Sequence, residues 1–86
     1  MNSLLARYAM IAGVSLLLGV AYAAGLSGLP FGMAAVIALT VGHTVVDVTT
    51  TPAALRTGPW YRRNITLNLG GTAFAAAILV AAIGLP

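Results

Sequence analysis

Three long apolar stretches decide what this chain can fold into. They cover about residues 8–26, 31–55 and 64–85, and Asp47 is the one formally charged side chain inside any of them. A helix needs about 20 consecutive apolar residues to cross the hydrocarbon core of a membrane, and each stretch is close to that length. The sequence therefore predicts an all-α integral membrane protein in which a helical hairpin over 31–85 follows an N-terminal span.

The composition agrees with a single membrane domain over residues 1–86. The chain is 60% hydrophobic and 6% charged, whereas soluble domains carry about 25% charged residues. It contains no cysteine, which excludes disulfides, thiolate catalysis and cysteine metal sites. The sequence also lacks paired carboxylates, nucleophile triads and phosphate-binding glycine loops. We therefore expect no enzymatic activity.

Glycine and proline predict where the helices end. Residues 25–32 hold three glycines and Pro30, a pattern typical of a tight turn between two helices. Pro52 lies near the end of the second stretch, where its missing N–H leaves the carbonyl of Val48 without a helical partner. We expect a kink or an early stop of the helix there.

The first stretch also resembles a secretory signal peptide. Arg7 is a charged start, residues 8–20 are apolar, and Ala21-Tyr22-Ala23 has the pattern of a cleavage site. We expect the first helix to be retained, with cleavage of residues 1–23 as the open alternative.

A basic loop is predicted over residues 56–63. It contains Arg56, Arg62 and Arg63 together with Trp60 and Tyr61, aromatic residues of the kind that anchor proteins at membrane interfaces. With three spans, the loop lies on the same side as the N-terminus, and the positive-inside rule places both in the cytoplasm. We expect a multi-pass protein of the cell membrane whose arginines bind phospholipid, with no other cofactor and no metal.

The second stretch carries a polar stripe. In a helix, Thr40, His43, Asp47 and Thr51 share one face, and the neighbouring valines lie off it. Two asparagines of the third stretch lie near the same membrane depth as residues 47–51 of this stripe, if the second and third stretches form an antiparallel hairpin. A hydrogen bond between the two groups is worth about 0.6 to 2 kcal/mol. These asparagines are Asn64 and Asn68.

Three interpretations of His43 and Asp47 are open, because an ionisable residue inside a span indicates function by default. In the first, Asp47 carries a proton or a cation in a transporter. In the second, His43 ligates a haem iron. In the third, the role is structural: the carboxylate accepts from the imidazole, or Asp47 pairs with an arginine such as Arg56 or Arg63 or with a neighbouring subunit. We favour the third.

The haem interpretation rests on a resemblance. Gly42, His43 and Asp47 resemble a motif of the large membrane-anchor subunit of succinate dehydrogenases, and Ser3 with Arg7 is similar to the quinone-site serine and arginine of that family. The chain is shorter than that family, and one histidine cannot supply both axial ligands of a haem.

Small residues recur at helical spacing in all three stretches, which favours close helix packing. They are more numerous than one short bundle can use, so we expect homo-oligomerisation or packing into a larger complex. The predicted packing positions are Gly13, Gly19, Gly42, Gly71 and Ala75.

The architecture over residues 25–84 resembles the pilins of conjugative type IV secretion systems, which are small hydrophobic helical hairpins with a short basic loop. Leu29-Pro30-Phe31-Gly32 is similar to a glycine-proline-phenylalanine-glycine break in some of them. The resemblance implies that Arg56, Arg62 and Arg63 face a lumen, where they bind lipid headgroups and moderate the field felt by single-stranded DNA.

We therefore expect a small self-associating membrane protein. In its sharpest form it is a pilin-like building block of a lipid-containing tube for DNA transfer, extruded as a surface filament. The first alternative is an accessory or haem-anchor subunit of a respiratory or transport complex. The second is a homo-oligomeric proton-coupled transporter that uses Asp47.

Overall fold

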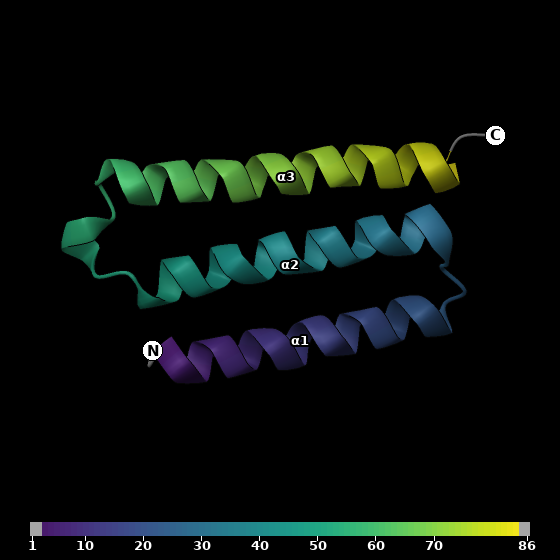
Figure 1. Cartoon of the computed structure of the whole chain (residues 1–86), viewed down its shortest axis with the longest axis horizontal. Helices are drawn as coiled ribbons and strands as arrows, with labels where there is room; N and C mark the ends of the chain where they lie inside the picture. Colours follow the sequence, from purple (N-terminus) through teal and green to yellow (C-terminus); the bar gives the residue numbers. More distant parts are fainter. Residues whose placement is uncertain (1–2, 85–86) are drawn as a thin grey trace.

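The computed structural model describes residues 3–84 and consists of three α-helices with one short 3₁₀ turn (Figure 1). The helices are α1 (Ser3–Ala23), α2 (Gly28–Thr50) and α3 (Pro59–Gly84), and the 3₁₀ turn η1 (Ala53–Leu55) lies between α2 and α3. All three helices are long and apolar enough to cross a membrane. At 1.5 Å per residue they are about 32, 35 and 39 Å long, against about 30 Å of hydrocarbon. The predicted all-α fold with three candidate spans is confirmed.

The three helices lie side by side in one flat layer (Figure 1). α2 occupies the middle and packs against α1 on one side and α3 on the other. The Cα atoms extend over 47 × 24 × 13 Å, so the layer is about one helix thick. Such a layer has no enclosed core and leaves two broad faces open. In the described part of the chain, the buried side chains are Ala6, Ala38, Val46 and Ala75.

The turn between α1 and α2 is closed by a Schellman motif. The N–H of Leu26 donates to the carbonyl of Ala21 (3.1 Å), and the N–H of Gly25 donates to that of Tyr22 (3.0 Å). Gly25 has φ 92° and Gly28 has φ 60°, a left-handed conformation that costs glycine little. The glycines of this segment therefore let the chain reverse within four residues, which makes α1 and α2 antiparallel neighbours.

Pro52 stops α2 early. The helix ends at Thr50 and not near residue 55. Of the two expected effects of Pro52, a kink or an early stop, the structure shows the early stop. Pro52 has no N–H to donate to the carbonyl of Val48, and the guanidinium of Arg56 replaces this donor. Its Nη2 donates to the carbonyl of Val48 (2.9 Å), and its Nε donates to the carbonyl of Thr51 (3.1 Å). A cation at a helix C-terminus also suits the helix dipole.

The other predicted helix bounds need correction at the basic end of the layer. α1 begins at Ser3, before the apolar run itself begins, and α3 begins at Pro59. Residues 59–63, predicted as loop, are therefore the first turns of α3. Proline at the first helical position fits the required φ, and the carbonyl of Gly58 accepts the N–H of Arg62 (3.1 Å). The polar ends of α1 and α3 are helical beyond the apolar runs, which periodicity of apolar residues cannot reveal.

Candidate functional site

The polar stripe of α2 divides between a helix contact and an open face. Thr40 turns toward α3, where its Oγ1 lies 2.6 Å from Oγ1 of Thr72. Oγ1 of Thr72 also lies 2.8 Å from the carbonyl oxygen of Asn68, and Oγ1 of Thr40 lies 3.0 Å from the carbonyl oxygen of Val36. One hydroxyl therefore donates across the gap while the other donates to its own helix. This short chain of hydrogen bonds ties α2 to α3.

Close backbone approach supports the same contact. A β-carbon at Gly71 would lie 3.5 Å from Cγ2 of Thr40, which is ordinary van der Waals contact. Ala75, one turn further along α3, is 2% exposed. The small residues predicted for packing on α3 thus lie in the α2–α3 contact.

The two asparagines do not provide the predicted interhelical bond. Asn64 and Asn68 are half-buried on α3. Within residues 3–84, their side chains make no hydrogen bond to the segment from Asp47 to Thr51. The polar link is Thr40–Thr72, one turn beyond Asn68. Sequence reasoning missed Thr72, although it follows Gly71, one of the small residues predicted for helix packing.

His43 and Asp47 lie open on one broad face of the layer. His43 is exposed and Asp47 is half-buried. In the described range, no hydrogen bond or ion pair joins either side chain to another residue, and no side-chain nitrogen or oxygen is buried without a partner. The carboxylate of Asp47 is therefore unpaired and accessible from outside the described chain. Among residues 3–84, the predicted imidazole–carboxylate bond and the predicted pairs with Arg56 and Arg63 are absent. Arg56 instead donates to carbonyls at the end of α2.

Thr51 completes the stripe beyond the end of α2. Its N–H donates to the carbonyl of Asp47 (3.1 Å), and its own carbonyl accepts from Arg56. Its role in this structure is thus to cap the helix with its backbone.

α1 meets α2 at Gly42. A β-carbon at this position would lie 2.7 Å from Cγ of Met10 and 3.5 Å from Cγ2 of Val14, so glycine is needed for the approach. Because Gly42 and Met10 are in contact, they lie at the same depth. This contact fixes the register of the two antiparallel helices. Counting three residues toward the basic end on each helix brings Arg7 to the level of Val45.

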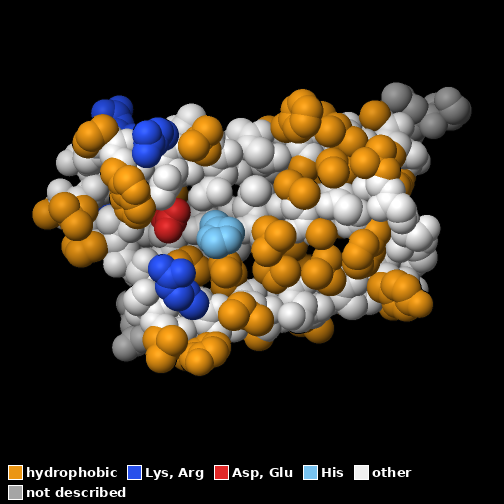
Figure 2. All heavy atoms as spheres, in the orientation of Figure 1, with side chains coloured by type: hydrophobic (Ala, Val, Ile, Leu, Met, Phe, Trp, Pro, Cys, Tyr) orange, Lys and Arg blue, Asp and Glu red, His pale blue; other side chains and the backbone are white. Residues whose placement is uncertain are grey.

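Arg7 therefore lies at a depth between His43 and Asp47, and on the same face. Figure 2 shows the acidic side chain, the imidazole and one basic side chain near one another on one broad face of the layer. On α1, Ala6 and Ala9 line an apolar groove on the opposite face, and Arg7 does not. We call this face, defined by Arg7, His43 and Asp47, the ionisable face. Arg7 is exposed and has no ion pair with any described residue. The sequence singled out the two α2 residues but not this proximity of Arg7, which depends on the register at Gly42.

The opposite broad face is apolar. Residues two positions apart in a helix lie on nearly opposite sides, so Val41 and Val45 face away from His43. Together with Val48, they are 40 to 54% exposed. We call this side of α2 the valine face. The sequence correctly separated these valines from the polar stripe.

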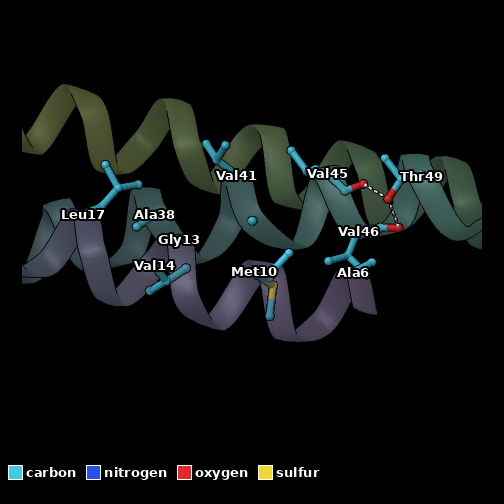
Figure 3. A pocket seen from close by; sticks show the side chains of 12 residues that line it. Ala6, Met10, Gly13, Val14, Leu17, Ala38, Val41, Val45, Val46 and Thr49 are labelled. Carbon is cyan, nitrogen blue, oxygen red and sulfur yellow. Dashed lines mark hydrogen bonds between the residues drawn. The ribbon is translucent and has the colours of Figure 1, made fainter. Parts of the chain in front are cut away.

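An apolar groove of about 220 Å³ runs between α1 and α2 on the valine face (Figure 3). Thr49 is the polar side chain in its lining, and its hydroxyl donates to the carbonyl of Val45 (2.7 Å) in its own helix. Gly13 lines the groove, and His43 does not. The groove thus suits apolar chains, and the predicted haem ligand His43 lies outside its lining.

The basic side chains gather at one end of the layer, because α1 begins where α2 ends and α3 begins. Arg62 and Arg63 are exposed on the first turns of α3. Trp60 next to them is 59% exposed, and Tyr61 is half-buried. This end combines cations with interfacial aromatic residues, as expected for a segment at the level of lipid headgroups.

The five predicted packing positions fall into two groups. Gly42, Gly71 and Ala75 lie in helix contacts within the chain. A β-carbon at Gly13 or Gly19 would meet nothing within 4 Å. These two positions on α1 therefore have room for a side chain in the described structure.

No three His, Cys, Asp or Glu side chains come together among residues 3–84 in a way that could hold a metal ion. No protein-family model matches this chain, and no curated protein or solved structure matches it significantly.

Proposed function

We propose that the chain is a self-associating, multi-pass membrane subunit, a repeated building block of a larger assembly. One observation carries the proposal: an unpaired carboxylate and an imidazole stand on the open face of a layer one helix thick. Apolar side chains on such a face are covered by lipid at no cost, but ionisable ones are expensive there and normally face protein. A single layer cannot fold them inward, so another chain must cover them.

The free small residues of α1 support the same proposal. In lipid, helices associate through close packing and polar contacts, and not through hydrophobic force. A β-carbon at Gly13 or Gly19 would meet nothing within 4 Å, so both positions leave room for close approach on α1. Their use requires a further helix.

The sharper form of the proposal is a subunit of a lipid-containing conjugative tube. The tight α2–α3 hairpin with arginines at its turn supports it. In this form, Arg62 and Arg63 contact phospholipid headgroups, single-stranded DNA passes through the assembly, and the turn is cytoplasmic before the copies are extruded as a surface filament.

The test is the mass and shape of the purified protein kept with its native lipid. Native mass spectrometry should give a multiple of the chain mass, and negative-stain electron microscopy should show uniform particles. Filaments whose assembly fails in the Arg62→Gln/Arg63→Gln variant support the pilin form, and closed particles contradict it. A single-chain mass in lipid would overturn the whole proposal.

A second candidate, a proton-coupled transporter, is favoured by the outward-opening carboxylate of Asp47. Reconstituted vesicles with a pH-sensitive dye inside would test it. Proton flux that is lost in Asp47→Asn and kept in Arg62→Gln supports transport, whereas flux equal to that of empty vesicles excludes it.

A further inference from the structure

We propose that two copies of this chain pair through the ionisable face, with Arg7 of each chain forming an ion pair with Asp47 of the other. The inference rests on the proposed function and adds to it the surface, the symmetry and the residues of the contact. Neither residue has a partner within the described chain, although both lie on the same face.

Arg7 and Asp47 lie at almost the same membrane depth. From the register at Gly42 and Met10, Arg7 lies two residues from the level of Asp47, a difference of about 3 Å along the helix axis. Two copies inserted in the same orientation keep every residue at its own depth. A cation and an anion at almost the same depth can therefore meet between copies without either helix shifting along the membrane normal.

Two-fold symmetry then satisfies both charges of each chain. Arg7 is on α1 and Asp47 is on the adjacent α2. An axis along the membrane normal, passing between these helices at the ionisable face, lays α1 of one copy over α2 of the other. The contact is isologous, so the pair from Arg7 to Asp47 occurs twice. An axis centred on α2 would instead bring the two carboxylates together.

The size of the face is sufficient. The layer measures 47 by 24 Å, about 1,100 Å², and the part formed by α1 and α2 is about two-thirds of it, close to the ~800 Å² that each partner buries in a typical specific complex. The groove on the valine face stays open to lipid in this pairing. The charges thus select the face, because the apolar side offers no group that distinguishes a partner from a lipid chain.

Disulfide trapping between differently tagged copies tests the geometry, since the natural chain contains no cysteine. Copies with Arg7→Cys are co-expressed with copies that carry Asp47→Cys. A cross-link between the two variants is expected, because the second ion pair of the dimer is left intact in this combination. The matched control is Ala9→Cys with Val45→Cys, two positions on the same helices at similar depth that line the groove on the opposite face. The control should give at most about a tenth of the cross-linked product.

Charge exchange tests the energetics. Arg7→Asp alone and Asp47→Arg alone each place like charges across the contact twice, and the dissociation constant of the dimer should rise at least about tenfold. The double exchange should return it to within about threefold of the natural chain. Labelling of the basic end from outside sealed vesicles checks that all variants keep one orientation.

The two proposals fail in different ways. A natural chain that is a single chain in lipid overturns the proposed function. If the natural chain is oligomeric, but the Arg7/Asp47 cross-link does not exceed the groove control or the charge exchanges leave dissociation unchanged, the ionisable face is not the contact and the proposed function stands.

Discussion

The two helix contacts in this chain are built differently. α2 meets α3 through a hydroxyl pair, Thr40 with Thr72 at 2.6 Å, and through small residues that bring the backbones close. α2 meets α1 through Gly42 under the side chain of Met10, and a groove of about 220 Å³ opens beside that contact. The first contact has both elements that hold helices together in lipid. The second has packing around Gly42, together with the buried Ala6 and Val46.

This difference indicates which helix is available to other chains. In lipid, an exposed apolar surface gives no force toward a neighbour, so the number of close or polar contacts decides how firmly a helix is held. α1 has the looser contact, and it also carries the unpaired Arg7 and two glycines at which an added β-carbon would meet nothing within 4 Å. The α2–α3 hairpin is therefore the more firmly held pair, and α1 is the helix with the weaker tie to the rest of the described chain.

The largest expected effect is at Gly42. Gly42→Ile places a branched side chain where even a β-carbon would be 2.7 Å from Cγ of Met10. Overpacking of this kind costs about 2 kcal/mol and should separate α1 from α2. Gly19→Ile is the control, since its site is open. Unfolding in mixed micelles measures both, and equal stability of the two variants would show that Met10 moves aside freely.

The hydroxyl pair comes next. Thr40→Val removes the bond to Thr72 and should lower the free energy of unfolding by about 1 kcal/mol. A double-mutant cycle with Thr72→Val isolates the interaction. Thr49→Val is the control, because the hydroxyl of Thr49 bonds to carbonyls of its own helix. A coupling energy near zero would mean that Gly71 and Ala75 alone hold α3 to α2.

A smaller effect is expected at the turn that leads into the hairpin. Arg56→Gln removes two hydrogen bonds to the end of α2 in an exposed setting, so a loss of about 0.5 to 1 kcal/mol is expected. Arg62→Gln removes the same charge without such bonds and should be neutral. Hydrogen exchange of the last turn of α2 is the local measurement. Unchanged exchange in Arg56→Gln would show that water replaces the guanidinium at the carbonyl of Val48.

The sequence predicted the class of fold, and it marked Pro52 as the place where the second helix kinks or stops, because both depend on local chemistry. Apolar length decides that a helix can span a membrane, and the missing N–H of Pro52 decides that α2 stops. Which polar groups meet could not be read in the same way. The approach of Thr40 to Thr72 and the proximity of Arg7 to Asp47 depend on register between helices. That register follows from one glycine among many, and periodicity does not single it out.

The smallest expected effect has the opposite sign. Gly13→Ala adds a methyl group at the wall of the groove, where nothing lies within 4 Å of the new β-carbon. Alanine also favours the helical conformation, so the isolated chain should gain about 0.5 kcal/mol or slightly more. Gly70→Ala on α3, an exposed and equally open position, should give the same gain. Both variants are compared in detergent that keeps the chain single and again in lipid. If Gly13→Ala lowers the free energy of unfolding in lipid and Gly70→Ala does not, another helix packs against the groove in lipid. Contacts between copies then include the valine face. Equal gains in both media would show that no helix packs against the groove wall at Gly13 in lipid.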